Sequence, residues 1–99
     1  MTAQTRYSRA ARDDLIAIWS YIAIDDPAAA DRQIDRIEAA IAQLREFPEI
    51  GHAREDAGAG VKLVLQDQYL VIYRHDPAKA LVTIERVVHG RRNLDGMIG

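Results

Sequence analysis

Residues 61–89 read VKLVLQDQYLVIYRHDPAKALVTIERVVH, and most of this stretch is predicted to be β-strand. Runs rich in Val, Ile, Leu and Tyr that are bounded by short polar segments are typical of strands. The runs here predict strands at 61–65, 69–75 and 80–89. Because only a few residues separate consecutive strands, neighbours in the chain must pair in the antiparallel direction.

The residues before position 61 have the periodicity of helices. Apolar residues recur there every three or four positions, which is the spacing of one helix face. The first series predicts a helix at about 9–24, with Ser8 as a suitable N-cap. The second predicts a helix that begins at Asp26-Pro27 and ends before Pro48. The two series are Ala11, Leu15, Ile18 and Ile22, then Ala30, Ile34, Ile37, Ile41 and Leu44.

Together these elements predict an α+β fold with two layers. Almost nothing joins the two helices, so they should form an antiparallel hairpin, packed on one face of a three- to four-stranded antiparallel sheet. Residues 5–7 are the candidate for the fourth strand. Residues 47–60 are predicted to be a loop that Phe47 and Ile50 pin to the core. A chain of 99 residues is expected to form a single domain, 1–99.

Composition argues against several classes of protein. The chain has no cysteine, so disulfides, thiolate nucleophiles and Cys-ligated zinc are excluded. No apolar run is long enough to span a membrane and residues 1–12 lack the core of a signal peptide, so a cytoplasmic protein without a membrane partner is expected. His52, His75 and His89 lack metal-ligand spacing, and neither a metal nor a cofactor is expected. The net charge of -2 argues against non-specific binding of nucleic acid.

The segment that is richest in chemistry runs from Arg86 to Leu94 and reads RVVHGRRNL. Strict alternation places Arg86 on the strand face that carries the apolar Val82, Ile84 and Val88, so its charge must reach the rim or pair with a carboxylate. Arg74 lies on the neighbouring strand. Such a cluster of arginines could hold phosphate or carboxylate groups. The alternative is an internal ion-pair network that anchors the C-terminal tail.

Two aromatic side chains, Trp19 and Tyr21, lie off the apolar stripe of the first predicted helix. They could pack at the edge of the core. They could equally form a patch that contacts a partner, because aromatic residues are enriched at protein interfaces. The acidic pairs Asp13-Asp14 and Asp25-Asp26 are interpreted as helix termini, since carboxylates suit the positive end of a helix.

Residues 85–94, ERVVHGRRNL, resemble the C-terminal signature of ParE toxins, which belong to the ParE/RelE superfamily of toxin–antitoxin systems. Further segments resemble that family in the same order. YSRAARDDLIAIWSYIA resembles its first strand and helix, and AADRQIDRIEAAIAQLREFPEIG its second helix with the Pro-x-x-Gly that follows. VKLVLQDQYLVIYRHD resembles the central strands. The resemblance covers about residues 5–95.

This resemblance implies a bacterial toxin without enzymatic activity that poisons DNA gyrase and can stabilise a plasmid. It also implies a cognate ParD-like antitoxin, in a hetero-oligomer that meets DNA only through the antitoxin. The candidate target-binding residues are Arg86, His89, Arg91, Arg92, Asn93 and Leu94. The candidate antitoxin-binding residues are Trp19, Tyr21, Ile24 and Arg74.

The RelE branch of the superfamily, whose members cleave mRNA on the ribosome, is the main alternative. That branch uses basic residues and usually a C-terminal tyrosine, and it commonly has Arg where this chain has Leu70. Here only two lysines are present and no tyrosine follows Tyr73. The candidates for RNase chemistry would be Arg86, His89, Arg91 and Arg92, and arginine is a poor proton carrier. A third possibility is a protein with the same fold that is not toxic and serves only as a partner or corepressor.

Overall fold

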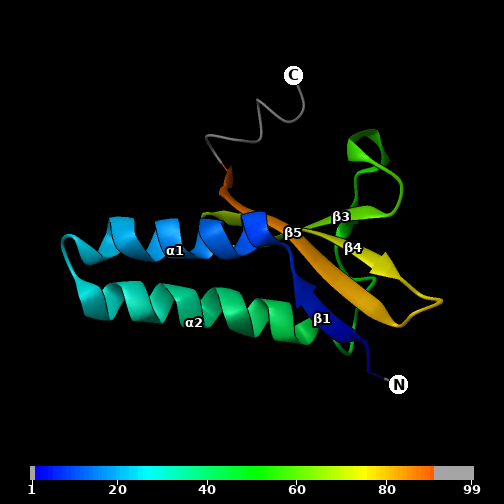
Figure 1. Ribbon diagram of the computed structural model, residues 1–99, viewed down its shortest axis with the longest axis horizontal. Helices are drawn as coiled ribbons and strands as arrows, with labels where there is room; N and C mark the ends of the chain where they lie inside the picture. The colour runs from blue at the N-terminus through cyan, green and yellow to red at the C-terminus, as the bar shows by residue number, and fades with distance from the viewer. Residues whose placement is uncertain (1, 91–99) are drawn as a thin grey trace.

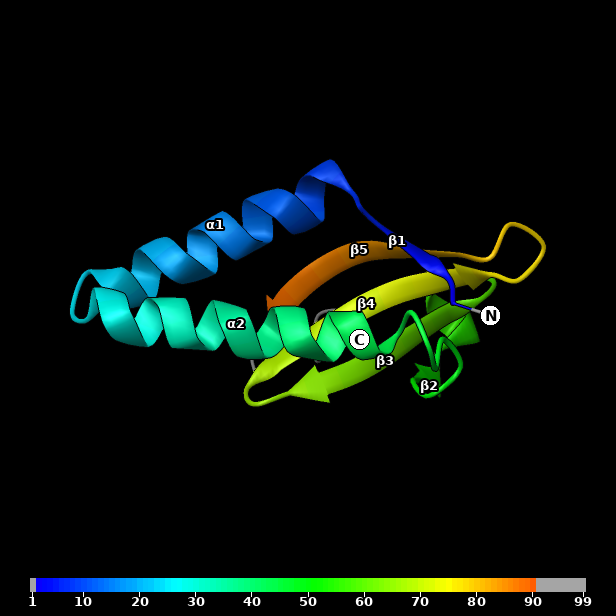
Figure 2. The ribbon, with the colours of Figure 1, turned by 90° about the horizontal axis from the view of Figure 1, so that it is seen from below.

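In the computed structural model, which describes residues 2–90, two helices cover one face of a five-stranded sheet (Figures 1 and 2). This arrangement confirms the predicted α+β fold with a helical hairpin. In chain order the elements are β1 (Gln4–Tyr7), α1 (Arg9–Ala23), α2 (Pro27–Gln43), β2 (His52–Ala53), the 3-10 helix η1 (Glu55–Ala57), β3 (Val61–Gln66), β4 (Tyr69–Asp76) and β5 (Leu81–His89).

The sheet has the strand order β1-β5-β4-β3-β2. The three central strands pair in the antiparallel direction, as their short connections require. The sheet has more strands than the three or four expected, and it is mixed, because β1 runs parallel to β5 along Gln4–Tyr7 and Leu81–Ile84. No short turn joins β1 to β5, so nothing local imposes an antiparallel direction on this pair. The other edge is β2, a two-residue strand within the predicted loop.

Both helices begin at side-chain caps. The hydroxyl of Ser8 accepts from the backbone N–H of Ala11 at 3.0 Å. The carboxylate of Asp26 accepts from the N–H of Ala29 at 3.1 Å, and Pro27 is the first residue of α2. These caps satisfy N–H groups that have no partner within the helix. The predicted start of each helix is therefore confirmed.

The main core lies between the helices and the sheet. Tyr73 and Ile84 are fully buried there against the helical residues Ile37 and Ile41. Burial of one such aliphatic side chain stabilises the fold by roughly 1.5–3 kcal/mol. A second apolar cluster lies on the opposite face of the sheet, since its members on β4 alternate with the buried Val71 and Tyr73. That cluster comprises Val61, Leu63, Leu70, Ile72 and Val88.

A β-bulge in β5 changes which face its side chains occupy. Tyr73 is opposite Ile84 whereas Ile72 is opposite Arg86, so Glu85 is an additional residue on β5. Such a residue reverses the alternation beyond it. Val87, not Val88, therefore joins the helix-facing core. The expectation that Val82, Ile84, Arg86 and Val88 share one face is wrong for this reason.

The loop between α2 and β3 is anchored by a buried tyrosine. The hydroxyl of Tyr73 donates to the carbonyl of Pro48 at 2.8 Å and accepts from the N–H of Gly51 at 2.9 Å. A Cβ atom on Gly51 would lie 2.5 Å from that hydroxyl oxygen, so only glycine fits there. Phe47 and Ile50 are exposed, and the prediction that they pin this loop is wrong. The anchor is polar and comes from a strand 22 residues away.

Candidate functional site

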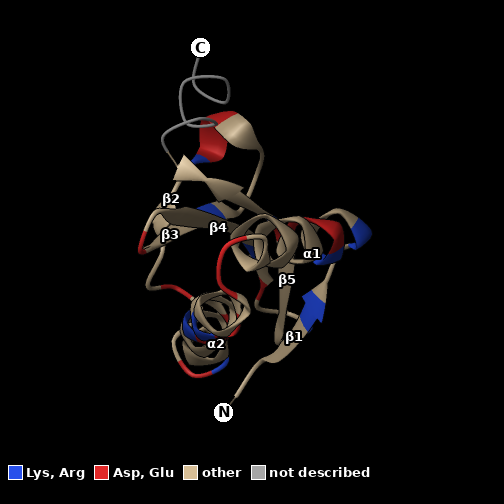
Figure 3. Ribbon diagram, turned by 90° about the vertical axis from the view of Figure 1, so that its left-hand side faces the viewer, with Lys and Arg blue, Asp and Glu red and all other residues tan. Residues whose placement is uncertain are grey.

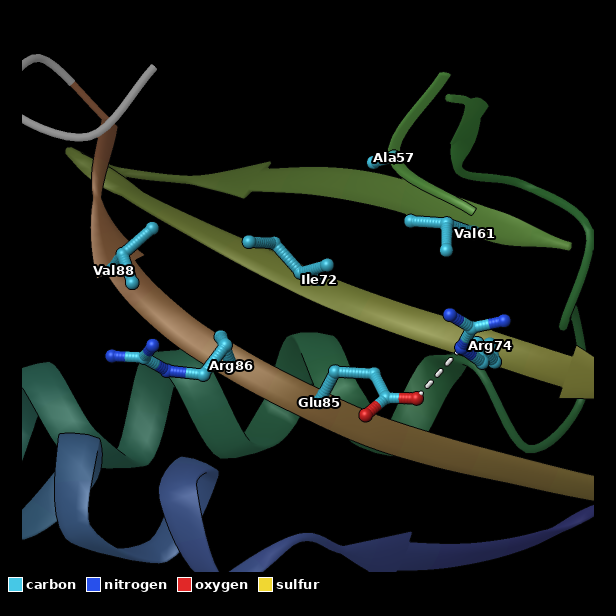
Figure 4. A pocket seen from close by; sticks show the side chains of 7 residues that line it. All are labelled: Ala57, Val61, Ile72, Arg74, Glu85, Arg86 and Val88. Atoms are coloured by element: carbon cyan, nitrogen blue, oxygen red, sulfur yellow. Dashed lines mark hydrogen bonds and ion pairs between the residues drawn. The ribbon is translucent and has the colours of Figure 1, made fainter. Parts of the chain in front are cut away.

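A cavity of about 270 Å³ lies on the sheet face that the helices leave uncovered (Figure 4). Apolar side chains from three strands contribute to its wall, and three charged side chains project around them. The seven lining residues are Ala57, Val61, Ile72, Arg74, Glu85, Arg86 and Val88. The cavity therefore contains Arg74 and Arg86, two of the residues that the sequence singled out.

Arg86 is held by a carboxylate from α1. Its Nε and Nη2 atoms donate to the two oxygens of Asp14 at 2.7 and 2.9 Å, which is a bidentate ion pair. One of those oxygens also accepts from the backbone N–H of Val87 at 2.9 Å. The hydrogen bonds that Arg86 donates to Asp14 raise the pKa of the Arg86 guanidinium above its usual value. Arg86 is thus a fixed cation with its orientation set by Asp14.

The backbone explains why Asp14 lies there. Strand β1 pairs with β5 only as far as Ile84, and the edge of β5 is unpaired beyond that point. Ser8 then donates from its hydroxyl to the carbonyl of Glu85 at 2.7 Å, and Asp14 accepts from Val87. Side chains at the start of α1 thereby replace the missing strand partner, since the polar groups of an edge strand need partners. Figure 4 shows Arg86 on β5, with α1 running below that strand.

Arg74 is held on the other side of the cavity. Its Nε donates to Oε1 of Glu85 at 2.9 Å, and its Nη1 donates to the carbonyl of Ala59 at 2.7 Å. Glu85 is the additional residue of the β-bulge, so the bulge places its carboxylate beside Arg74. The Arg74–Glu85 pair and the Arg86–Asp14 pair are both internal ion pairs. The C-terminal tail, which such pairs were expected to anchor, lies outside the described residues.

The chemistry of this cavity favours binding over proton transfer. Arginine keeps its charge at any physiological pH and presents five N–H donors, which suits carboxylates and phosphates. Glu85 is the only other ionisable side chain among the lining residues, and its carboxylate already forms an ion pair with Arg74. Within residues 2–90, no three His, Asp or Glu side chains are placed to hold a metal ion. No helix in the same range is long and apolar enough to cross a membrane.

His89 belongs to a different cavity, of about 390 Å³, beside α1. Its ring meets that of Tyr69 edge to face, with centroids 5.6 Å apart, and its Nε2 lies 3.3 Å from Oε1 of Gln68. Burial raises the pKa of the Tyr69 phenol. His89 is therefore separate from the cavity that contains the two arginines. The remaining target-binding candidates, Arg91, Arg92, Asn93 and Leu94, lie outside the described residues.

The antitoxin-binding candidates fall into two places. Trp19, Tyr21 and Ile24 are exposed on α1 or directly after it. The indole N–H of Trp19 donates to a carboxylate oxygen of Asp31 on α2 at 2.8 Å, which fixes the ring across the helical hairpin. Arg74 lies in the cavity on the opposite side of the sheet, so it does not join the other three.

Sequence reasoning missed Asp14 and Glu85 as site residues. Asp14 was interpreted as a helix-terminal carboxylate, although the need of Arg86 for an acidic partner was expected. With 15 acidic residues in the chain, that need alone could not select one of them. The sequence carries no signal for the bulge that places Glu85.

Comparisons with known proteins agree with the fold. Residues 5–94 match the family described as the ParE toxin of the type II toxin-antitoxin system, parDE. The chain belongs to the ParE toxin family. This ParE-family chain is 33% identical to Toxin ParE3 of Caulobacter vibrioides over 70 residues, which cover 71% of this chain and 68% of that protein.

Two solved structures resemble this ParE-family chain. The chromosomal ParDE system of P. aeruginosa has a chain with a TM-score of 0.73 at 20% identity, covering 89% of this chain and 96% of that one. At this identity the likeness concerns the fold alone. The RelBE2 toxin-antitoxin complex of Mycobacterium tuberculosis has a chain with a TM-score of 0.63 at 28% identity, covering 90% of this chain and 99% of that one.

Proposed function

We propose that this ParE-family toxin acts by binding DNA gyrase and does not cleave RNA. The observation that carries the proposal is the makeup of the cavity on the uncovered sheet face. Two arginines, each held by a carboxylate, provide fixed donors, and the cavity-lining residues include no histidine, lysine or tyrosine. Fixed donors suit recognition of an acidic group, because little side-chain entropy is lost on binding.

The target-binding surface in this proposal combines the cavity with the C-terminal segment. Arg86 is the residue common to both. His89, Arg91, Arg92, Asn93 and Leu94 follow it directly in the chain and are proposed to contact the target. Gyrase and the antitoxin are proteins of the bacterial cytoplasm, so the proposal places this toxin there too.

A ParD-like antitoxin is the proposed second partner. The solved complexes with the same fold are toxin-antitoxin systems, which supports this part of the proposal. The exposed aromatic and aliphatic residues Trp19, Tyr21 and Ile24 are suitable contacts, because large apolar side chains dominate interface energetics. Arg74 would need a separate contact, on the other face of the sheet. Binding of an antitoxin should raise the melting temperature of the toxin by mass action.

Ribosome-dependent RNA cleavage is the second candidate, and the likeness to the RelBE2 complex favours it. That reaction needs an acid and a base within hydrogen-bond reach of the 2′-OH and the leaving oxygen. The cavity supplies Glu85 alone, and Arg74 holds that carboxylate at 2.9 Å. His89 is in the other cavity. The separation of these groups supports gyrase binding over RNA cleavage.

The decisive experiment adds purified protein to gyrase and supercoiled plasmid DNA. Accumulation of linear DNA is expected, because trapped gyrase holds broken strands. The double variant Arg91→Ala/Arg92→Ala should abolish this effect and leave antitoxin binding largely unchanged. Arg32→Ala, which removes an exposed arginine from α2, is the matched control and should behave as the wild type.

Two results would contradict the proposal. Full toxicity of the double variant would remove the C-terminal arginines from the target surface. Intact supercoiled DNA, together with cleaved mRNA in a translation extract, would assign the chain to the RNase branch. If neither target responds and expression without antitoxin permits growth, the chain is a partner or corepressor with the toxin fold.

A further inference from the structure

Helix α1 carries exposed apolar side chains on the side that borders α2. Ile16 is 64% exposed and Trp19 is 40% exposed, and the half-buried Ala23 continues the series. Their spacing of three and then four residues keeps these side chains within an arc of about 60° on the helix. The indole N–H of Trp19 donates to Asp31 of α2 at 2.8 Å, so this apolar stripe lies beside the second helix. Exposed apolar residues that are grouped in this way mark an interaction surface.

Helix α2 carries a row of carboxylates next to the apolar stripe. Asp31, Asp35 and Glu38 are exposed, and their spacing of four and then three residues keeps them on one side of the helix. Asp31 accepts from Trp19, which identifies that side as the one towards α1. Within residues 2–90, the ion pairs of the structure involve none of the three carboxylates. Figure 3 looks along the hairpin from the turn that joins the helices, and it shows acidic positions on both. This acidic row is therefore free to pair with a basic partner.

The surface formed by the apolar stripe and the acidic row has a negative net charge. Arg12 lies four residues before Ile16 on the same side of α1 and is exposed, but the three carboxylates outnumber this guanidinium. An anionic partner such as nucleic acid or an anionic membrane would be repelled. A second copy that used the same patch would bring two negative surfaces together. The charges therefore favour a basic partner.

We propose that this surface binds an amphipathic helix of a partner protein, with an apolar stripe and a row of Lys or Arg beside it. Ile16 and Trp19 contact the apolar stripe of the partner, and its basic side chains lie opposite the acidic row. A helix is recognised through anchors three and four residues apart, which is the spacing of both rows here. Among the proposed antitoxin contacts only Trp19 belongs to this surface, since Tyr21 lines the cavity that contains His89 and Ile24 follows the end of α1.

The dimensions of the hairpin suit a helix of about four turns. Helix α1 has 15 residues and is therefore about 22 Å long. The hydrogen bond to Asp31 already orients the ring of Trp19, so binding loses little side-chain entropy there. A contact of this length buries less than the ~800 Å² per partner of a standard interface. We therefore expect an affinity in the micromolar range.

A synthetic helical peptide of about 18 residues tests this inference on the full chain. The peptide has leucines along one stripe, lysines along the neighbouring row, and alanine and glutamine elsewhere. Trp19 is the chain's one tryptophan, so its fluorescence reports binding directly. We expect a blue shift of the emission and a dissociation constant of about 10–100 µM at low salt. A second peptide with glutamate in place of each lysine should bind at least about tenfold more weakly, and about 0.5 M salt should remove most of that difference.

Charge reversal of the acidic row separates recognition from folding. The double variant Asp35→Lys/Glu38→Lys should bind the lysine peptide about tenfold more weakly, and the glutamate peptide about as tightly as the wild type binds the lysine peptide. A variant that had only lost structure would bind neither. If circular dichroism shows that this variant is unfolded, Asp35→Asn/Glu38→Gln keeps the side-chain shapes and should weaken binding about threefold. Glu55→Lys reverses a charge on η1, far from the hairpin, and should stay within about twofold of the wild type. Ile16→Ala should weaken binding about threefold.

Three results would overturn the inference. The first is no change in the fluorescence of Trp19 up to about 1 mM peptide. The second is equal affinity for the two peptides, which would mean that the acidic row does not select the partner. The third is a folded double reversal variant that does not accept the glutamate peptide, or a Glu55→Lys effect as large as that of the reversal. None of these results depends on gyrase or on an antitoxin, so failure here and failure of the proposed function are distinguishable.

Discussion

Replacement of Asp14 by alanine should destabilise the fold far more than its place on an outer helix suggests. The change removes two charge-assisted hydrogen bonds from Arg86, at 2.7 and 2.9 Å, and one from the N–H of Val87, at 2.9 Å. Asp14 is only 15% exposed, whereas Arg86 is 51% exposed. Water therefore screens the ion pair in part, and loss of the ion pair contributes at most about 1 kcal/mol to the destabilisation.

Loss of the hydrogen bond between the N–H of Val87 and Asp14 contributes the larger part of the destabilisation. The N–H of Val87 is partly buried and lies where β1 no longer reaches β5, so no strand replaces Asp14 as its partner. A buried donor without a partner costs about 1–3 kcal/mol. The expected total for Asp14→Ala is about 2–3 kcal/mol. For a chain of this size, that loss lowers the melting temperature by roughly 10–20 °C.

Urea unfolding of a matched set of variants can separate the two shares. Asp14→Asn keeps an oxygen for Val87 but loses the charge, and should cost about 1 kcal/mol or less. Arg86→Ala removes only the ion pair and should cost a similar amount. The double variant Asp14→Ala/Arg86→Ala should cost little more than Asp14→Ala alone, because both changes remove the same pair. A cost below about 0.5 kcal/mol for Asp14→Ala, or an equal cost for Arg86→Ala, would refute the reasoning.

Three further changes test other parts of the structure. Tyr73→Phe removes both hydrogen bonds that hold the loop between α2 and β3, and should lower the free energy of unfolding in urea by about 1–3 kcal/mol. Gly51→Ala should cost at least as much, because the added Cβ would lie 2.5 Å from the same hydroxyl oxygen. Wild-type stability in both variants would contradict this anchor. The hydrogen bond from His75 lowers the pKa of the Glu49 carboxyl below its usual value of 4.5. This contact therefore stabilises the fold fully above pH 4.5, and the stabilisation is lost as the pH falls through the lowered pKa. Glu49→Gln should therefore flatten the acid limb of the stability profile, and an unchanged limb would argue against the contact. Trp19→Phe loses only an exposed hydrogen bond and should change the unfolding free energy by less than about 0.5 kcal/mol while weakening antitoxin binding, as titration calorimetry can measure.

Local sequence patterns predicted the elements well because the forces that start and end them are local. Ser8 and Asp26 cap their helices as expected, and β3, β4 and β5 differ from the predicted strands by one residue at an end. A helix face and a polar turn each involve residues within a few positions of one another. The ordered motifs around ERVVHGRRNL were likewise sufficient to indicate the family.

Pairing between distant residues was beyond the reach of such patterns. The parallel β1–β5 pair joins residues 77 positions apart, and no local pattern in residues 4–7 specifies the strand with which they pair. The bulge adds a single residue to β5 relative to β4, which moves Val87 into the helix-facing core and Val88 out of it. Alternation along β5 is a rule about one strand. The bulge is a property of the pair of strands.

The candidate site shows most clearly which features local sequence patterns predict and which depend on contacts between distant residues. Arg86 could be selected from the sequence, because a charge within an apolar strand requires a partner. Its carboxylate could not, because Asp14 lies 72 residues away and differs in no local feature from the other acidic residues. Composition and periodicity determined the helices, the central strands and the presence of a basic segment. Only the tertiary structure decided which charges meet, because ion pairs and free strand edges depend on distances in space and not on separation along the chain.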